Sequence, residues 1–140
     1  IELENLAAIG VSAMMHGYMA FNKNQEILVP FRTWRNTNTG KAAARLSELF
    51  NFNIPLRWSI SHLYECIIDG ESHVKDIDYL ATLDAYIHWQ LTGERVTGIG
   101  DASGMLPIDP DTARLCDEGK MEQVNLDGVM PAAELIAKVK

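Results

Sequence analysis

The sequence predicts an α/β domain in which strands and a hairpin come first and packed helices follow. Residues 7–14 form a mostly apolar run of small and β-branched residues, which is typical of a buried strand. Residues 18–21 and 27–31 flank a polar break that contains two asparagines, which indicates a hairpin. Later segments repeat apolar residues at helical spacing, so helices are expected after the strands.

The strongest helical pattern covers residues 59–68. Its apolar residues recur at positions i, i+3, i+4, i+7 and i+8, namely Ile60, Leu63, Tyr64, Ile67 and Ile68. Ser59 is the expected N-cap, and the pair Asp69-Gly70 is expected to end the helix. This stripe predicts a helix with one face packed in the core.

The remaining elements follow from shorter patterns of the same kinds. Residues 31–40 have no periodicity and are expected to form a loop. In chain order we then expect a helix over 41–50 capped by Asn38 or Thr39, a short strand over 77–81, a helix over 83–91 closed by Gly93, and short helices over 111–118 and 131–138.

Composition and charge exclude several classes of protein. The 140 residues are about one domain in length, and 47% of them are hydrophobic, which allows a sizeable core. The net charge is −7 and no basic stripe is present, so neither nucleic acid nor an anionic membrane surface is expected as a partner. No apolar run approaches the ~20 residues that span a bilayer. The two cysteines, 50 positions apart, form no disulfide framework, which favours a cytoplasmic protein.

His16 and Gly17 are the first candidate site residues. They follow the predicted strand over 7–14, and ligands of open α/β sheets bind where strands end. The alternative is a turn histidine that is bonded to a backbone carbonyl. Spacing alone leaves both interpretations open.

Trp34, Arg35, Asn36 and Asn38 form the second candidate group. The face of a tryptophan can pack on the apolar face of a sugar ring, while amides and a guanidinium can bond several hydroxyls. The alternative is a tryptophan in the core whose polar neighbours satisfy the backbone of a turn.

Two other patterns predict no site. The four histidines, His16, His62, His73 and His88, lack metal-ligand spacing even when Cys66 is added, so no metal site is expected. The glycine-rich stretch over 98–104 lacks the lysine of a phosphate-binding loop and is expected to be a structural turn.

The order of motifs resembles the FGGY carbohydrate kinases, especially their xylulose-kinase-like members. Residues 11–17 resemble the family's strand and Met-His-Gly turn, and residues 30–39 resemble its Pro-x-x-x-Trp-Asn-Asp-x-Arg segment. The helix over 59–68 resembles the one that follows in the family. Residues 84–94 and 101–104 resemble its Asp-Tyr-Leu…Leu-Thr-Gly-Glu stretch and its Asp-Ala-Ser turn. The resemblance covers about residues 5–110.

The resemblance implies a fold, a reaction and a site. The fold would be part of a ribonuclease-H-like (actin-like ATPase) domain, and the full-length enzyme would use ATP and Mg²⁺ to phosphorylate a ketose or polyol in a cleft between two domains. His16 and Gly17 would line the sugar pocket, and residues 34–38 would approach the sugar hydroxyls. A homodimer is a possible assembly.

The chain departs from the family in ways that limit this expectation. Where the family has Trp-Asn-Asp-x-Arg, residues 34–38 read Trp-Arg-Asn-Thr-Asn, so a carboxylate becomes an amide and the arginine is lost from its place. The family's phosphate-binding Asp-x-Gly-Thr turn would precede Ile1, and its catalytic aspartate and nucleotide domain would follow Lys140.

Residues 1–140 are therefore expected to be a partial N-terminal domain that holds no catalytic residue, binds no cofactor and is inactive alone. Such a piece is expected to expose apolar surface. A non-catalytic sugar-binding or regulatory module is the alternative.

Overall fold

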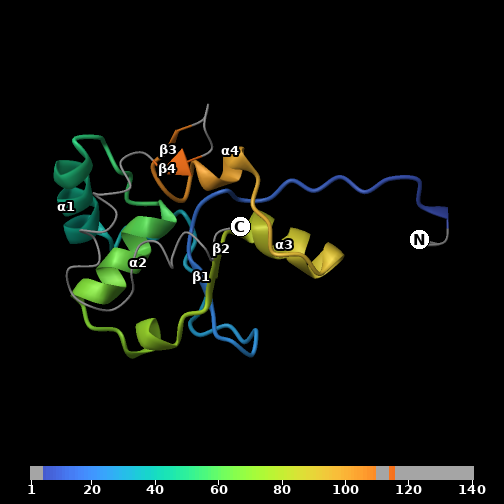
Figure 1. The fold of residues 1–140 in the computed structure, drawn as a ribbon, viewed down its shortest axis with the longest axis horizontal. Helices are drawn as coiled ribbons and strands as arrows, with labels where there is room; N and C mark the ends of the chain where they lie inside the picture. Colours follow the sequence, from blue (N-terminus) through green and yellow to red (C-terminus); the bar gives the residue numbers. More distant parts are fainter. Residues whose placement is uncertain (1–4, 110–113, 116–140) are drawn as a thin grey trace.

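The fold is built around a two-stranded antiparallel sheet with helices on both of its faces. The computed structural model describes residues 5–109 together with residues 114 and 115. Strand β1 (Met19–Phe21) pairs with β2 (Tyr79–Ala81), with Met19 opposite Ala81 and Phe21 opposite Tyr79. Figure 1 shows this pair in the middle, with α1 and α2 on one side and α3 on the other. The α/β class predicted from the sequence is confirmed.

Five helical segments surround the sheet in the described part of the chain. They are α1 (Gly40–Phe50), α2 (Ser59–Ile68), the 3-10 helix η2 (Ser72–Asp76), α3 (Leu83–Thr92) and the short α4 (Ile99–Ala102). A second small sheet joins β3 (Ile108–Asp109) to β4 (Arg114–Leu115). Figure 1 shows β3 and β4 beside α4. No helix among the described residues is long and apolar enough to cross a membrane.

Side chains of the central sheet alternate between two apolar clusters, as the period of a strand dictates. Tyr18, Ala20 and Leu80 contact the cluster formed mainly by α1 and α2. Met19, Phe21 and Tyr79 contact the other cluster, which includes Trp89 of α3. The ring of Trp89 lies edge to face with those of Phe21 and Tyr79, with the Phe21 and Trp89 centroids 5.4 Å apart. Both faces of β1 are therefore buried.

The predicted strand over residues 7–14 is wrong. Residues 6–14 are extended but pair with no strand in the described part of the chain, and Leu6, Ile9 and Val11 are about half exposed or more. Figure 1 shows this segment running away from the body of the molecule. The sequence pattern detects the apolar character, but a strand also needs a partner for its backbone groups. The expectation of exposed apolar surface is met here.

The predicted hairpin is half correct. The chain does turn back over residues 22–26, and Leu28 donates its backbone N–H to the carbonyl of Ala20. Within residues 27–31, however, only Ile27 forms a bridge, to Phe21, and Arg32 forms a second isolated bridge to Tyr18. The regular partner of β1 is β2. Pro30 offers no N–H for a ladder, which limits strand formation in this stretch.

The predicted caps are correct in part. Thr39 is the N-cap residue of α1, as predicted, but its hydroxyl donates to the carbonyl of Leu56, and a carboxylate oxygen of Glu65 accepts the N–H of Ala42 instead. The N-cap of α2 is Trp58 instead of Ser59, which is the first helical residue and donates its hydroxyl to the carbonyl of Gly17. Both side chains that were expected to cap helices therefore bond to distant loops.

Most of the other predicted elements are confirmed. The helices over 41–50, 59–68 and 83–91 match α1, α2 and α3 to within one residue, and the strand over 77–81 contains β2. Gly70 and Gly93 follow α2 and α3 with positive φ angles. The helix predicted over 131–138 lies outside the described residues. So does most of the one over 111–118, in which residues 114 and 115 form β4 instead of helix.

Candidate functional site

The turn at Gly17 lies at the beginning of the β1 region and is closed by several backbone contacts. Its φ angle is +104°, and a Cβ atom there would lie 2.6 Å from the carbonyl oxygen of Arg32. The Gly17 N–H donates to the carbonyl of Arg57, and Ser59 bonds the Gly17 carbonyl. Only glycine fits this close approach without strain.

His16 packs against the turn that follows α4. Its Nδ1 lies 3.0 Å from the carbonyl oxygen of Gly104. Because a carbonyl can only accept, Nδ1 carries the proton, and in a neutral ring Nε2 is then an acceptor. The bond to a backbone carbonyl is the alternative that the sequence left open, and it leaves one ring nitrogen for a further partner.

The loop that carries Trp34 is stabilised mainly by local bonds. The N–H of Asn36 donates to the carbonyl of Thr33, and the side chain of Asn36 accepts the N–H of Asn38. Trp34 is 49% exposed, so it does not fill the core, and the guanidinium of Arg35 lies over its ring at 5.5 Å. The expected loop is confirmed, and its large ring is accessible.

An open cavity of about 650 Å³ lies between this loop, α1 and the chain that leads into α2. A volume of this size can hold a sugar-sized ligand. Its lining is mostly apolar or neutral, with one cation and no carboxylate: Trp34, Thr37, Gly40, Ala43, Ala44, Ser47, Asn53, Ile54, Pro55, Leu56 and Arg57.

The structure brings some of the candidate residues together and leaves others apart. Of the six candidates, Trp34 lines the cavity, while His16, Gly17, Arg35, Asn36 and Asn38 do not. Arg57 links the Gly17 turn to the cavity, because its carbonyl accepts the N–H of Gly17 and Arg57 also lines the cavity. Sequence reasoning missed Arg57 and Asn53, because the loop over 51–58 has no pattern that shows it folding against α1.

A polar cluster of five side chains lies next to the Gly17 turn, on the α2 side of the sheet. Arg32 donates to both carboxylate oxygens of Glu71, at 3.0 and 2.5 Å, and to the sulfur of Cys66 at 3.1 Å. Tyr18 donates its hydroxyl to Nε2 of His73, whose Nδ1 lies 3.5 Å from Glu71. The hydrogen bonds from Arg32 lower the pKa of Glu71, and burial lowers the pKa of His73.

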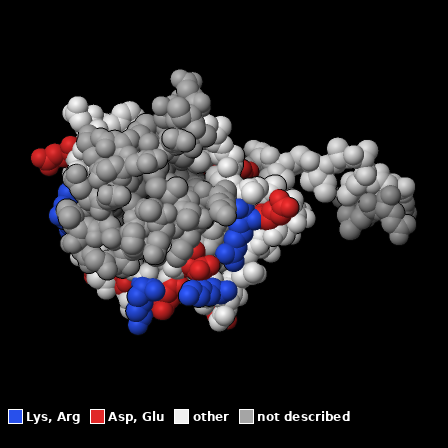
Figure 2. Space-filling view, viewed as in Figure 1, with Lys and Arg blue, Asp and Glu red and all other residues white. Residues whose placement is uncertain are grey.

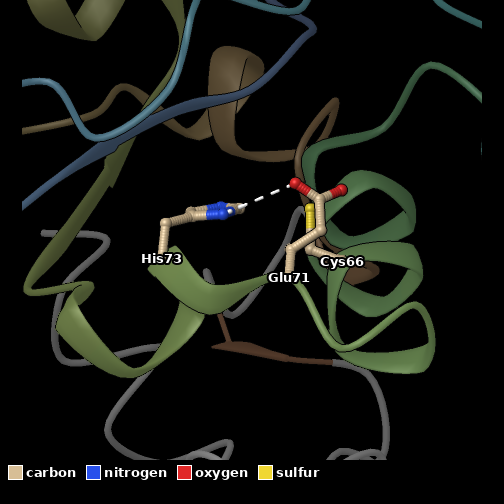
Figure 3. Close-up of side chains that lie close together, drawn as sticks. All are labelled: Cys66, Glu71 and His73. Atoms are coloured by element: carbon tan, nitrogen blue, oxygen red, sulfur yellow. Dashed lines mark ion pairs between the residues drawn. The ribbon is translucent and has the colours of Figure 1, made fainter.

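Cys66, Glu71 and His73 have the right atoms for a metal, but their bonds do not suit one. Their potential ligand atoms lie within 4.8 Å of one another, and Figure 3 shows the His73 imidazole facing the Glu71 carboxylate, with the Cys66 thiol close to that carboxylate. However, the guanidinium of Arg32 already provides the positive charge at both the thiol and the carboxylate. Burial also raises the pKa of the Cys66 thiol to about 11, which disfavours the thiolate that zinc needs.

His62 and Asp101 are among the buried polar residues of the described chain that lack a complete set of partners. His62 in α2 is fully buried with neither ring nitrogen bonded, and burial lowers its pKa to about 4. Asp101 in α4 accepts the Thr82 hydroxyl at 2.5 Å through one oxygen, while its other oxygen has no partner. Burial raises the pKa of Asp101 to about 6. Thr82 also accepts the N–H of Ala85, so this contact joins α4 to the start of α3.

Charge on the visible face is mixed. Figure 2 shows lysine and arginine side chains beside aspartate and glutamate, while residues 5–15 carry no charge. This face shows no broad basic surface among the described residues.

The comparison with protein families identifies the chain. The family model described as "FGGY family of carbohydrate kinases, N-terminal domain" matches residues 1–114. The chain therefore belongs to the FGGY family of carbohydrate kinases, as the motifs at the Met-His-Gly turn and the Trp34 loop indicated. No curated protein sequence matches it closely enough to serve as a relative.

Solved structures of kinases share the fold. A xyloylose kinase from Brucella ovis is 22% identical, with a TM-score of 0.75, over 93% of this chain and 29% of its own. The xylulose kinase from Bifidobacterium adolescentis is 15% identical, with a TM-score of 0.75, over 98% and 35%. A gluconate kinase from Lactobacillus acidophilus is 19% identical, with a TM-score of 0.73, over 93% and 27%. This chain thus spans about a third or less of each kinase, and the likeness establishes the actin-like fold.

Proposed function

We propose that this chain supplies sugar-binding residues of an ATP-dependent kinase that transfers the γ-phosphoryl group to a hydroxyl of a ketose or polyol, with a xylulose-like sugar as the first candidate. The observation that carries the proposal is the family match over residues 1–114. The cavity beside Trp34 supports it, because an exposed aromatic face next to polar side chains suits a polyhydroxylated ligand.

Each candidate residue has a role that its chemistry allows. The unprotonated Nε2 of His16 would accept a hydrogen bond from a sugar hydroxyl, and the ring of Trp34 would cover an apolar face of the sugar. The amides of Asn36 and Asn38 and the guanidinium of Arg35 would bond other hydroxyls. Gly17 would let the backbone approach the ligand closely.

The cofactors of the proposed reaction are ATP and Mg²⁺, and the one potential metal-ligand cluster among the described residues does not fit Mg²⁺. Mg²⁺ prefers oxygen ligands in octahedral geometry. The potential metal-ligand cluster among the described residues contains a thiol and an imidazole and is bonded to Arg32. We therefore assign no step of phosphoryl transfer to this chain and expect it to be inactive alone.

The test is an assay of sugar-dependent ADP formation by the intact kinase, with a panel of pentuloses, hexuloses, polyols and aldonates. We expect activity to be highest with a pentulose. Trp34→Ala is expected to raise the KM for the sugar about tenfold, the effect of losing about 1.4 kcal/mol of binding. It should hardly change the unfolding temperature, because half of the side chain is exposed.

Leu91→Ala is the matched control, since Leu91 is 61% exposed on the far helix α3. If no compound in the panel supports ADP formation, the kinase proposal fails. Calorimetric binding of a sugar without phosphorylation would then favour a non-catalytic sugar-binding module. An unchanged sugar KM in Trp34→Ala would remove Trp34 from the site.

A further inference from the structure

Arg32 lies where the two candidate segments meet. Its carbonyl oxygen accepts the N–H of Tyr18 at 2.8 Å, and its N–H donates to the carbonyl of Tyr18 at 3.2 Å. The same carbonyl oxygen is the atom with which a side chain at position 17 would clash. Along the chain it is two residues before Trp34. A displacement of this one backbone position would therefore move both the Gly17 turn and the loop over 33–38.

The side chain of Arg32 also fixes that backbone position, through its own contacts with Glu71 and Cys66. Its guanidinium bonds both oxygens of Glu71, and this two-point contact defines an orientation as well as a distance. One nitrogen also reaches Cys66, and the guanidinium carbon lies 5.7 Å from the centre of the Tyr18 ring. A lysine would keep the charge but could not reproduce the two parallel bonds.

Glu71 is itself held in place, so it can act as an anchor. Its N–H donates to the carbonyl of Cys66 near the end of α2, and Gly70 before it turns the chain with a φ of +66°. His73 approaches the same carboxylate and is fixed by Tyr18. Tyr18, His73, Glu71 and Arg32 thus form a closed ring of contacts, which joins the Tyr18–Arg32 bridge next to β1 to the beginning of η2.

We propose that Arg32 is a positioning residue of the sugar site. Through its ion pair with Glu71 it fixes the position of the Trp34 loop relative to the Gly17 turn. The role in sugar binding rests on the proposed function. Neither Arg32 nor Glu71 lines the cavity beside Trp34, so the pair acts on the ligand only through the backbone that it fixes.

The experiment compares Arg32→Lys and Glu71→Gln with Asp78→Asn in the intact kinase. Asp78 pairs with Arg95 on the α3 side of the sheet, and the two ion pairs are similarly exposed, at 25% and 31% for Arg32 and Glu71 and 28% and 27% for Arg95 and Asp78. We expect the two site variants to raise the sugar KM about tenfold and to leave the KM for ATP unchanged. Asp78→Asn should change neither value.

A second measurement does not depend on activity. Hydrogen exchange followed by mass spectrometry should show faster exchange over residues 33–38 in Glu71→Gln, with α1 protected as in the wild type. Exchange at 33–38 that stays at the wild-type rate overturns the positioning role, as does an unchanged sugar KM in an active enzyme. If the wild type phosphorylates no sugar while exchange at 33–38 still rises, the proposed function fails and the positioning of the loop stands.

Discussion

His16 donates its Nδ1 proton to the backbone carbonyl of Gly104, which lies 3.0 Å away although the two residues are 88 positions apart in the chain. A Cβ atom at position 104 would lie 2.7 Å from that same nitrogen and 2.8 Å from the side chain of Met15. The Met-His-Gly turn and the Asp-Ala-Ser-Gly turn are therefore in direct contact. The glycine-rich stretch over 98–104, which was predicted to be a structural turn, contains the short helix α4, and the turn after that helix orients the candidate histidine.

Gly104→Ala is expected to move the His16 ring and break its hydrogen bond. The free energy of unfolding should fall by about 1 to 3 kcal/mol, the usual cost of forcing an extra methyl group into a packed contact. The sugar KM of the intact kinase should rise about tenfold. Gly100→Ala is the matched control, because a Cβ there meets no atom within 4 Å. Equal behaviour of the two variants in denaturant titrations would contradict the contact.

Gly17→Ala should be more damaging, since the clash is with backbone and the φ of +104° is strained for any residue with a side chain. We expect the free energy of unfolding to fall by at least about 2 kcal/mol. Gly10→Ala, in the exposed segment with open space around it, should have little effect. Urea denaturation followed by circular dichroism measures both, and a wild-type midpoint for Gly17→Ala would refute the close approach to Arg32.

His62→Leu tests the buried imidazole. In the folded protein its pKa is lowered to about 4 from 6.5, so between these values the unfolded chain binds more protons than the folded one. Stability from this group is complete above pH 6.5 and is lost as the pH falls towards 4, by about 3 kcal/mol at most. The variant should remove that part of the acid sensitivity in denaturant titrations at several pH values.

The control for His62 is His88→Leu, which removes a partly exposed histidine from α3. We expect it to keep the wild-type loss of stability between pH 6.5 and 4. An identical pH dependence in wild type and His62→Leu would show that the imidazole is not buried in neutral form.

Asp101→Asn should change the pH dependence in the opposite direction. The folded protein raises the pKa of this carboxyl from 3.8 to about 6, so between these values the folded chain binds more protons than the unfolded one. Stability from this group is therefore complete below pH 3.8 and is lost as the pH rises to 6, by about 3 kcal/mol at most. The amide keeps an acceptor for Thr82 and cannot ionise, so the variant should gain stability relative to wild type across this window.

Asp76→Asn, at an exposed position in η2, is the control for this measurement. It should follow the wild-type curve. A parallel curve for Asp101→Asn would mean that the Asp101 carboxyl is solvated in the folded state.

Local patterns predict the helices of this chain well. The stripe from Ile60 to Ile68 gives α2 with its correct ends, because the spacing of apolar residues and the Asp69-Gly70 stop are both local properties. A local pattern cannot predict which distant group a side chain will bond. Ser59 and Thr39 have the chemistry of N-caps, yet each bonds a distant carbonyl, and a glutamate from a neighbouring helix takes over at the start of α1.

The candidate site shows the same division. Trp34 and His16 stand out by residue type, and the structure leaves one accessible and gives the other a ring nitrogen free to accept. Arg57 and the Arg32–Glu71 pair have no sequence signal, because their importance comes from which loops meet in space. The apolar run over 7–14 is an error of a related kind, since a strand is defined by a partner that the run itself does not contain.

The pairing of β1 with β2 has a consequence for the order in which the chain folds. These strands are about 60 residues apart, whereas α1 and α2 are in contact and are joined by residues 51–58. Closing the longer loop costs more chain entropy before any contact repays it. We expect the α1–α2 pair to collapse first, and β1, together with the turn at Gly17, to become ordered only after residues 79–81 have arrived beside it.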